Sequence, residues 1–154
     1  MRPIKLGLLL GFIVVVGIQF LPQQRNENNE SAGHDLYRTL PVPERIGIIL
    51  KRSCYDCHSN STRYPWYAKV QPIRWWLDGH IRDGKKELNF DEFGNYSRRR
   101  RQSKLGAVAN SVEDGTMPLS TYTLIHQSAK LSDTEKQLII SWMRNNKDSL
   151  SRIK

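Results

Sequence analysis

The residues of this chain with the strongest chemical signature are Cys54, Cys57 and His58, which are spaced as Cys-x-x-Cys-His. Two thiols three positions apart on one helical turn can both reach the edge of one porphyrin and form thioether bonds to it. The adjacent imidazole then becomes the proximal iron ligand. The motif therefore predicts one covalently attached haem c with its iron.

Three other interpretations of these residues stay open: a disulfide between Cys54 and Cys57, a thioredoxin-like redox pair, or half of a zinc site. The chain has only these two cysteines, so no others can complete a four-cysteine zinc site. A redox pair is typical of a βαβ context, which the sequence does not show. A zinc site needs further ligands and usually a second paired motif. The pattern favours haem.

The composition fits a small soluble domain with appendages. The chain has 154 residues, of which 38% are apolar and 25% charged, and this length is typical of one domain. Four Trp and six Tyr supply flat side chains for a haem pocket. The formal net charge of +9 indicates an acidic protein partner, an anionic membrane surface or nucleic acid. Export, which the N-terminus predicts, argues against nucleic acid.

An apolar run over residues 6–18 follows Arg2 and Lys5 at the N-terminus. With its short extension it has about 16 residues, between a signal-peptide core and a full membrane span. No small-x-small cleavage site follows it, so the pattern favours an uncleaved signal anchor over a cleaved signal peptide. The leading positive charges keep the N-terminus in the cytoplasm and place the rest outside. That is also the compartment in which c-type haem is attached.

The chain divides into four predicted parts: a signal anchor over residues 1–21, a flexible linker over 22–40, a haem-binding domain over 41–146 and a polar tail over 147–154. The linker is polar and has no hydrophobic periodicity, as expected for a solvated tether. The tail is mostly polar and is expected to be frayed.

Helical periodicity predicts an all-α domain. A helix is expected to start near Pro43, to place Ile46, Ile49 and Leu50 on one face, and to run into the haem motif. A second helix is expected from Pro72, and a third is expected to end at Gly115. A closing helix follows the capping box at residues 131–135. The second helix has one apolar stripe, made of Ile73, Trp76, Leu77, His80, Ile81 and Leu88.

Met117, which precedes Pro118 in a predicted loop, is the predicted distal iron ligand. Proline fixes the backbone and removes a hydrogen-bond donor, which favours a rigid, water-poor loop over the iron. An ordinary packed methionine is the alternative. His80 is the other candidate for the distal position, although a core histidine would fit the same stripe. His126 is less favoured.

Two further features bear on the pocket. Trp66 and Tyr67 are expected to form part of its wall. The arginine run at residues 98–101 is expected to be a solvated face. The alternatives for this run are donors to haem propionates or a docking surface for an acidic redox partner.

Together these motifs resemble known haem proteins. The order of elements looks like that of a class I cytochrome c. A helix runs into Cys-x-x-Cys-His, a Met-Pro loop follows, and a capped helix closes the domain. More closely, the chain resembles the small bacterial haem-binding domain family. The matching pieces are residues 53–60, 62–67, 88–90, 117–120 and 122–126, with Trp76, His80 and Trp142. Phe93 is a departure, since the family often has Trp there. The resemblance implies an exported, often membrane-anchored monohaem protein, typically bacterial.

The predicted function is one-electron transfer in a periplasmic, membrane-anchored cytochrome. His58 and Met117 would hold the iron six-coordinate and leave no room for a substrate, so we expect no enzymatic activity. The predicted partners are a redox protein, for which the basic surface predicts acidic character, and the membrane. The alternative is a haem-based sensor or small-gas binder with an open or labile sixth ligand. A peroxidase is disfavoured because such enzymes usually carry a second Cys-x-x-Cys-His, and a haem-free zinc module is weaker still.

Overall fold

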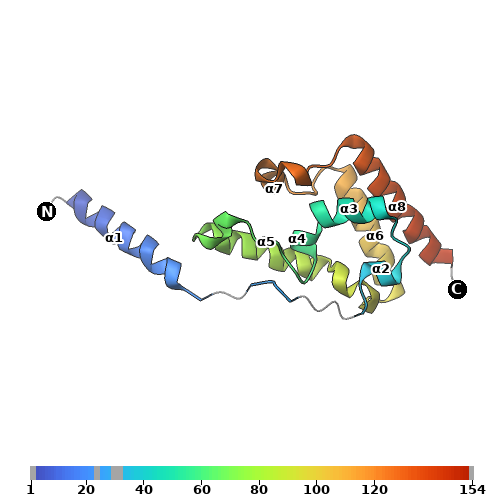
Figure 1. The fold of residues 1–154 in the computed structure, drawn as a ribbon, viewed down its shortest axis with the longest axis horizontal. Helices are drawn as coiled ribbons and strands as arrows, with labels where there is room; N and C mark the ends of the chain where they lie inside the picture. Colours follow the sequence, from blue (N-terminus) through green and yellow to red (C-terminus); the bar gives the residue numbers. More distant parts are fainter. Residues whose placement is uncertain (1–2, 23–24, 29–32, 153–154) are drawn as a thin grey trace.

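The computed structural model describes residues 3–22, 25–28 and 33–152, and in this part of the chain every regular element is helical (Figure 1). The predicted all-α fold is therefore confirmed. Within these ranges the structure has one isolated antiparallel β-bridge, between Glu27 and Ser61. The helices, with η for 3-10 helices, are α1 (Pro3–Gly17), η1 (Ile18–Phe20), α2 (Leu36–Thr39), α3 (Glu44–Ser53), α4 (Tyr55–His58), η2 (Trp66–Lys69), α5 (Ile73–Glu87), η3 (Phe90–Asn95), α6 (Arg98–Glu113), α7 (Ser120–Ile125), η4 (Gln127–Ala129) and α8 (Asp133–Arg152).

Helix α1 extends away from the folded domain (Figure 1). Its residues are all exposed. With η1 it forms an 18-residue apolar span, Pro3–Phe20, with a mean hydropathy of 2.0. This length and composition suit a membrane anchor or a signal sequence.

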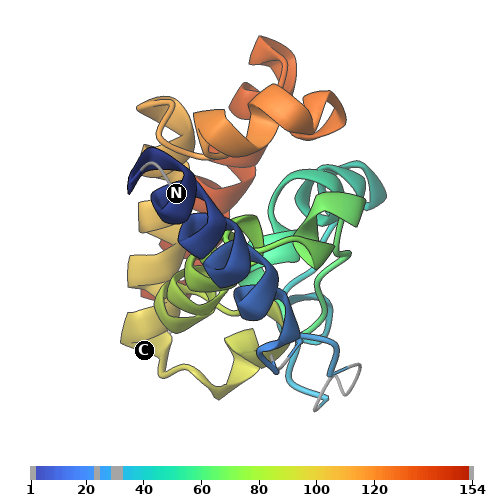
Figure 2. The same ribbon diagram turned by 90° about the vertical axis from the view of Figure 1, so that its left-hand side faces the viewer.

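The main core lies where α3 meets α6 and α8, and the last two helices lie side by side in both ribbon views (Figures 1 and 2). The predicted apolar face of α3 is buried, because Ile46, Ile49 and Leu50 are each at most 4% exposed. On α6 and α8 the buried residues recur at helical spacing, as an amphipathic helix requires. They are Leu105, Ala109 and Val112 on α6, and Ile139, Ile140 and Met143 on α8.

Helix α8 starts at the predicted capping box. Ser132 Oγ accepts a hydrogen bond from Glu135 N, and Glu135 Oε2 accepts one from Ser132 N at 2.9 Å, which satisfies two backbone donors at the helix start. The helix continues to Arg152, so the stretch expected to be a frayed tail is helical up to that residue. Leu150 packs against the core and gives this polar segment an apolar contact. Residues 153 and 154 lie outside the described ranges.

Helix α5 buries only part of the apolar stripe that its sequence predicts. Leu77 and Ile81 are buried and form a second small core with Tyr67 and Ala68 of η2. Ile73 and Trp76, at the start of the helix, are 45% and 48% exposed. The predicted apolar stripe is therefore covered over only part of its length. Periodicity identifies an apolar face but not whether another element covers it.

The predicted linker over residues 22–40 is largely part of the domain. Asn26 Nδ2 donates to Ser59 O and Thr62 Oγ1 at 2.9 and 2.8 Å, and Lys85 Nζ donates to Asn26 Oδ1 at 2.6 Å. Further along, Leu36 and Leu40 are buried in the main core. The folded domain thus starts before Pro41, and a solvated tether is not what the described linker residues form. Residues 23–24 and 29–32 of the linker are outside the described ranges.

We expect Asn26→Ala to lower the free energy of unfolding by about 1–3 kcal/mol, because it removes three side-chain hydrogen bonds, one of them from a charged lysine. Chemical denaturation of the haem-loaded protein measures the change. The matched control is Glu27→Ala, at a side chain that is 51% exposed, which should stay within about 0.5 kcal/mol of the parent protein. Equal stability of the two variants would show that this segment is a tether.

Candidate haem site

The Cys-x-x-Cys-His motif forms a helical turn of its own rather than the end of α3. The chain bends at Cys54, whose φ of −128° and ψ of −40° lie outside the helical region. Cys54 O then accepts hydrogen bonds from Cys57 N at 3.2 Å and His58 N at 3.0 Å. The predicted continuous helix is therefore interrupted, but Cys54 N still donates to Leu50 O at 2.8 Å, which ties the motif to the buried end of α3.

Cys54 and Cys57 are free thiols. Burial raises the pKa of Cys54 to about 12 and that of Cys57 to about 11, and a neighbouring charge adds to each shift. Thiols of this kind are protonated at neutral pH, unlike the reactive thiolate of a redox pair. Among the residues that the structure describes, no group of three or more His, Cys, Asp or Glu side chains is arranged to hold a metal ion. The zinc interpretation therefore gains no support.

His58 is held in the form that a metal ligand needs. Its Nδ1 lies 3.0 Å from Leu88 O, just beyond the end of α5. Because a carbonyl only accepts, Nδ1 must carry the proton, which leaves the lone pair on Nε2. Burial lowers the pKa of His58 and outweighs the opposing hydrogen bonds to Leu88 and Gly84. A neutral imidazole with its other nitrogen bonded to a carbonyl is the usual state of an iron or zinc ligand.

Two adjoining cavities of about 220 and 250 Å³ lie beside the motif. The first is bounded by α5 and α7 and is called here the α5 cavity, and the second is bounded by α6 and is called the α6 cavity. They share six lining residues, namely Ser53, Cys54, His58, Glu87, Met117 and Pro118. The α5 cavity adds Cys57, His80 and Tyr122, among others. The α6 cavity adds mainly apolar residues, including Leu88, Phe90, Val108 and Val112.

These linings fit a haem. The walls are largely apolar, as the flat face of a porphyrin requires, and one thiol and one imidazole line both cavities. Ser53 Oγ is buried and has no hydrogen-bond partner among the described residues, although it also lines both cavities. A buried hydroxyl without a partner lowers the stability of the fold unless a bound group or a water molecule forms a hydrogen bond with it. A polar edge of the cofactor would supply that partner.

Met117 lies on the same two cavities as His58. Its loop starts from a Schellman motif at the end of α6, in which Gly115 adopts a φ of +70° and Thr116 N donates to Ser111 O at 3.0 Å. Met117 N donates to the same carbonyl at 3.1 Å, which fixes the loop to α6. The side chain is 38% exposed, so the loop is less dry than the sequence predicted.

The two other candidate ligands differ in their positions. His80 lines the α5 cavity and lies edge-on to Trp76, with ring centroids 4.4 Å apart. It therefore stays an alternative to Met117. His126 lies outside both linings as described, and its Nε2 is 2.6 Å from the hydroxyl oxygen of Tyr67.

The aromatic residues expected at the pocket wall lie elsewhere, and the arginine run of α6 also lies away from both cavities. Trp66 is 79% exposed, and Tyr67 belongs to the small core beside α5. Arg100 lies over the ring of Tyr96 at 4.3 Å, and Arg101 Nε donates to Tyr96 O. The cation of α6 that lines a cavity is instead Lys104. These positions favour the solvated-face interpretation of the arginine run over a role toward haem propionates.

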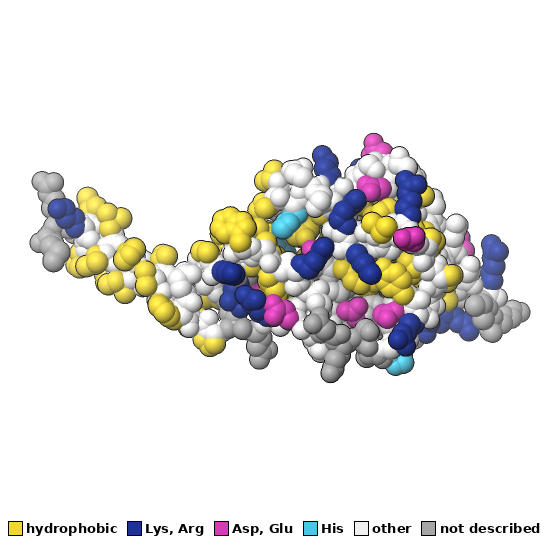
Figure 3. All heavy atoms as spheres, viewed as in Figure 1, with side chains coloured by type: hydrophobic (Ala, Val, Ile, Leu, Met, Phe, Trp, Pro, Cys, Tyr) yellow, Lys and Arg dark blue, Asp and Glu magenta, His cyan; other side chains and the backbone are white. Residues whose placement is uncertain are grey.

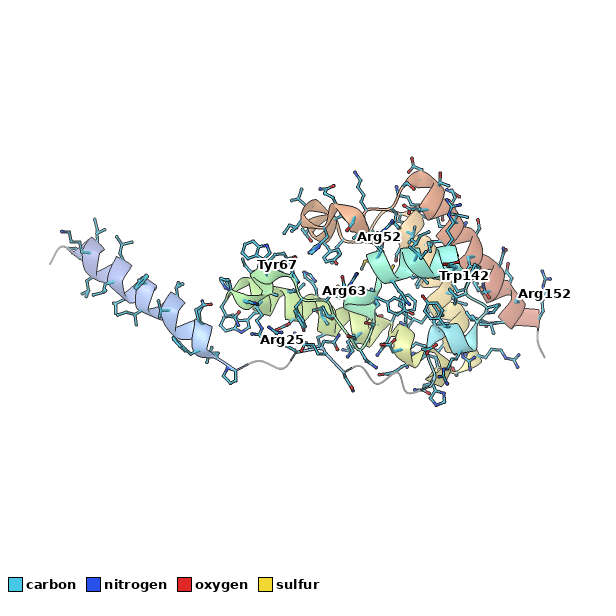
Figure 4. All side chains as sticks on the ribbon, viewed as in Figure 1. Arg25, Arg52, Arg63, Tyr67, Trp142 and Arg152 are labelled. Carbon is cyan, nitrogen blue, oxygen red and sulfur yellow. The ribbon has the colours of Figure 1, made fainter. Side chains whose placement is uncertain are left out.

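Asp56, inside the motif, has a structural role that the sequence did not reveal. Its carboxylate accepts hydrogen bonds from Arg63 Nε at 3.1 Å and from Tyr122 Oη at 2.7 Å, and Figure 4 shows Arg63 next to α4. Burial and the bond to Asp56 raise the pKa of Tyr122, so this phenol stays a donor. Through Asp56 the motif is connected to α7, which follows the Met117 loop.

Gly84 is the second residue that sequence reasoning missed. A Cβ at this position would lie 2.9 Å from Cys57 O and 3.3 Å from Cys57 Cβ. The absence of a side chain thus lets α5 approach the motif closely enough for Leu88 O to reach His58. A glycine inside a helical pattern is the signal that could have indicated this close approach.

A larger open cleft of about 900 Å³ lies along α5 and is lined mostly by charged and polar residues, including Arg25, Arg82, Lys85 and Lys86. Its lining contains none of Cys54, Cys57, His58, Met117 and His80. This cleft has the larger volume, but the residues that could bind a haem line the two smaller cavities.

Comparison with known proteins shows the family to which the chain belongs. Residues 13–145 match the haem-binding domain family, and the chain belongs to this family. The family expectation from the sequence motifs is therefore confirmed, and haem is its cofactor.

Two curated relatives are similar over shorter stretches. The chain is 27% identical over 101 residues to cytochrome c peroxidase Ccp of Escherichia coli (strain K12), a match that covers 64% of this chain and 22% of that protein. It is 26% identical over 76 residues to an uncharacterized protein of Schizosaccharomyces pombe, covering 41% of this chain and 13% of that protein. The chain thus spans about a fifth or less of the length of these relatives. No solved structure matches it.

We expect Gly84→Ala to destabilise the haem-loaded protein by about 1–3 kcal/mol, because its methyl group would overlap a backbone carbonyl that cannot rotate away. Gly79→Ala on the same helix is the matched control. Its Cβ would meet only the end of the Arg82 side chain, at 3.8 Å, so it should gain up to about 1 kcal/mol from helix propensity. Denaturant titration of both variants measures the difference. Similar gains in both would contradict the close approach of α5.

Proposed function

We propose that this protein is an electron carrier in which one haem c is bound covalently by Cys54 and Cys57 and ligated by His58 and Met117. The observation that carries the proposal is that His58 and Met117 line the same two cavities, next to two free thiols. When bound there, the haem would supply a one-electron couple between ferric and ferrous iron.

The protein residues would set the properties of that couple. The hydrogen bond from His58 Nδ1 to Leu88 O orients the imidazole and increases its basicity. The thioether of Met117 would favour ferrous iron and raise the reduction potential relative to two imidazole ligands. The apolar residues of the α6 cavity would exclude water from the ring and limit solvent reorganisation.

Electron transfer without catalysis is favoured over peroxidase activity. The similarity to the Escherichia coli peroxidase supports haem binding, but its matched part is only 22% of that enzyme. With His58 and Met117 both bound, the iron would have no open position for peroxide. The one Cys-x-x-Cys-His motif of this chain points the same way.

We further propose that α1 stays in the membrane and that the haem domain lies on the periplasmic side. The apolar span Pro3–Phe20, with Arg2 and Lys5 at its N-terminal end, supports this orientation. The net charge of +9 would steer an acidic redox partner and increase its rate of encounter.

One observation favours a second candidate, a haem-based sensor or small-gas binder. Met117 is 38% exposed and lies in a loop rather than on a packed helix. A thioether in such a position can be displaced more readily than a buried one. The two candidates differ in whether the sixth ligand leaves the iron.

Replacing Met117 by Leu keeps the side-chain volume and removes the thioether sulfur. We expect covalent haem to be retained and the reduction potential to fall by part of the roughly 0.8 V range that axial ligands control. Potentiometric titration measures the change. Met143→Leu, in the buried core of α8, is the matched control and should keep the parent potential. An unchanged potential in Met117→Leu would contradict ligation by Met117. His80→Ala would then be the variant to titrate.

Carbon monoxide distinguishes the two candidate functions. We expect the reduced protein to keep its absorption spectrum after carbon monoxide is added, because Met117 occupies the sixth position. The Met117→Leu variant should bind the gas. Rapid binding by the parent protein would mean a labile ligand and would favour the sensor.

A further inference from the structure

The end of the domain nearest to α1 carries exposed apolar side chains that neither core uses. They lie on η2, on the first turn of α5 and on α7, and all are at least 43% exposed: Trp66, Val70, Ile73, Trp75, Trp76, Leu124 and Ile125. We call these seven residues the apolar end. Figure 3 shows hydrophobic side chains gathered on this side of the domain, facing α1. The haem-site linings contain none of them.

The two parts of the apolar end are connected. Tyr67 of η2 is hydrogen-bonded to His126 at the end of α7, with 2.6 Å between Tyr67 Oη and His126 Nε2. The ring of His126 stacks on Tyr122 at 4.3 Å. Figure 4 shows Tyr67 between η2 and α7. The exposed residues on both sides therefore belong to one supported surface.

The short helix η1, which continues α1, contacts the domain at this surface. Gln71 N donates to Gln19 Oε1 at 3.0 Å, and Gln19 Nε2 donates to Gln71 O at 3.3 Å. Gln71 is only 5% exposed, whereas Val70 and Ile73 on either side are 44% and 45% exposed. An 18-residue helical span is about 27 Å long, close to the hydrocarbon thickness of a bilayer. With α1 in a bilayer, Gln19 would lie where the hydrocarbon region gives way to headgroups.

We propose that the apolar end inserts into the headgroup region of the membrane that α1 crosses. The proposal rests on the proposed retention of α1 in the membrane and adds a second contact to it. Trp side chains are enriched at this depth because they combine a large apolar body with a polar N–H. Three of the four tryptophans of the chain, Trp66, Trp75 and Trp76, lie in the apolar end. Exposed Lys69 lies among them and would meet anionic headgroups.

A bilayer explains this surface better than a protein partner does. The hydrogen bonds between Gln19 and Gln71 hold the apolar end at the level at which α1 leaves the hydrocarbon. A soluble partner that covered these residues would have to occupy the space of the lipid headgroups. In the proposed arrangement, the exposed tryptophans therefore lie in the lipid headgroup region.

The full-length, haem-loaded protein can be tested in vesicles of phosphatidylethanolamine and phosphatidylglycerol that contain a photoreactive phosphatidylcholine with its diazirine near the headgroup. After irradiation, mass spectrometry locates the labelled peptides. We expect labelling in α1 and in residues 66–76. The variant Trp66→Ser, Ile73→Ser, Trp75→Ser should lose labelling in residues 66–76 several-fold, with unchanged labelling of α1 and an unchanged haem spectrum.

The matched control is Ile48→Ser on α3, whose side chain is 58% exposed but lies outside the apolar end. It should leave all labelling unchanged. If the triple variant loads less haem, Trp66→Ser alone is compared, at a side chain that is 79% exposed.

Labelling of α1 without labelling of residues 66–76 would overturn the membrane contact and make the apolar end a surface for a soluble partner. Labelling of residues 66–76 that persists in the triple variant would also overturn it. Loss of both labels would overturn the anchor as well. The haem spectrum, which does not depend on the membrane, reports separately on the electron-carrier proposal.

Discussion

The site depends on how closely α5 approaches the Cys-x-x-Cys-His turn. Gly84 lies against the backbone of Cys57, at a spacing that leaves no room for a Cβ. One turn later, Leu88 O accepts the Nδ1 proton of His58 and so decides which ring nitrogen keeps a lone pair. Helix α5 contributes neither a thiol nor an imidazole to the motif. The carbonyl that follows it nevertheless determines which nitrogen of His58 carries the proton. If α5 moved outward, both the packing and the tautomer would be lost together.

The opposite side of the site is coupled to the same turn. Asp56 lies between the two cysteines and accepts a hydrogen bond from Tyr122 of α7. Helix α7 directly follows the Met117 loop, whose other end is fixed to α6 by the Schellman motif at Gly115. The turn that carries His58, the proposed proximal ligand, and the loop of the proposed distal methionine are therefore connected through one half-buried carboxylate. Such a connection limits movement of the two ligands relative to each other, which suits an iron that changes charge without changing ligands.

What the sequence predicts well is what depends on spacing along one helix. The buried faces of α3, α6 and α8 and the capping box at Ser132 follow from short-range periodicity and local hydrogen bonding. Contacts between distant segments are invisible to such patterns. Asn26 looks like any polar linker residue until Ser59, Thr62 and Lys85 surround it. The motif gives the chemistry of the cofactor, but the cavities, the tautomer of His58 and the role of Gly84 come from tertiary packing.

Helix α5 would also connect the haem site to the proposed membrane contact. Its first turn carries Ile73 and Trp76 in the apolar end, and its last turn reaches His58 through Gly84 and Leu88. A helix of 15 residues is a rigid spacer of about 22 Å. If its first turn rests in the headgroup region, the distance and tilt of the haem site relative to the bilayer are set by the helix and not by a flexible tether. A redox partner would then meet the haem in one orientation, which favours a partner that is itself held at the membrane.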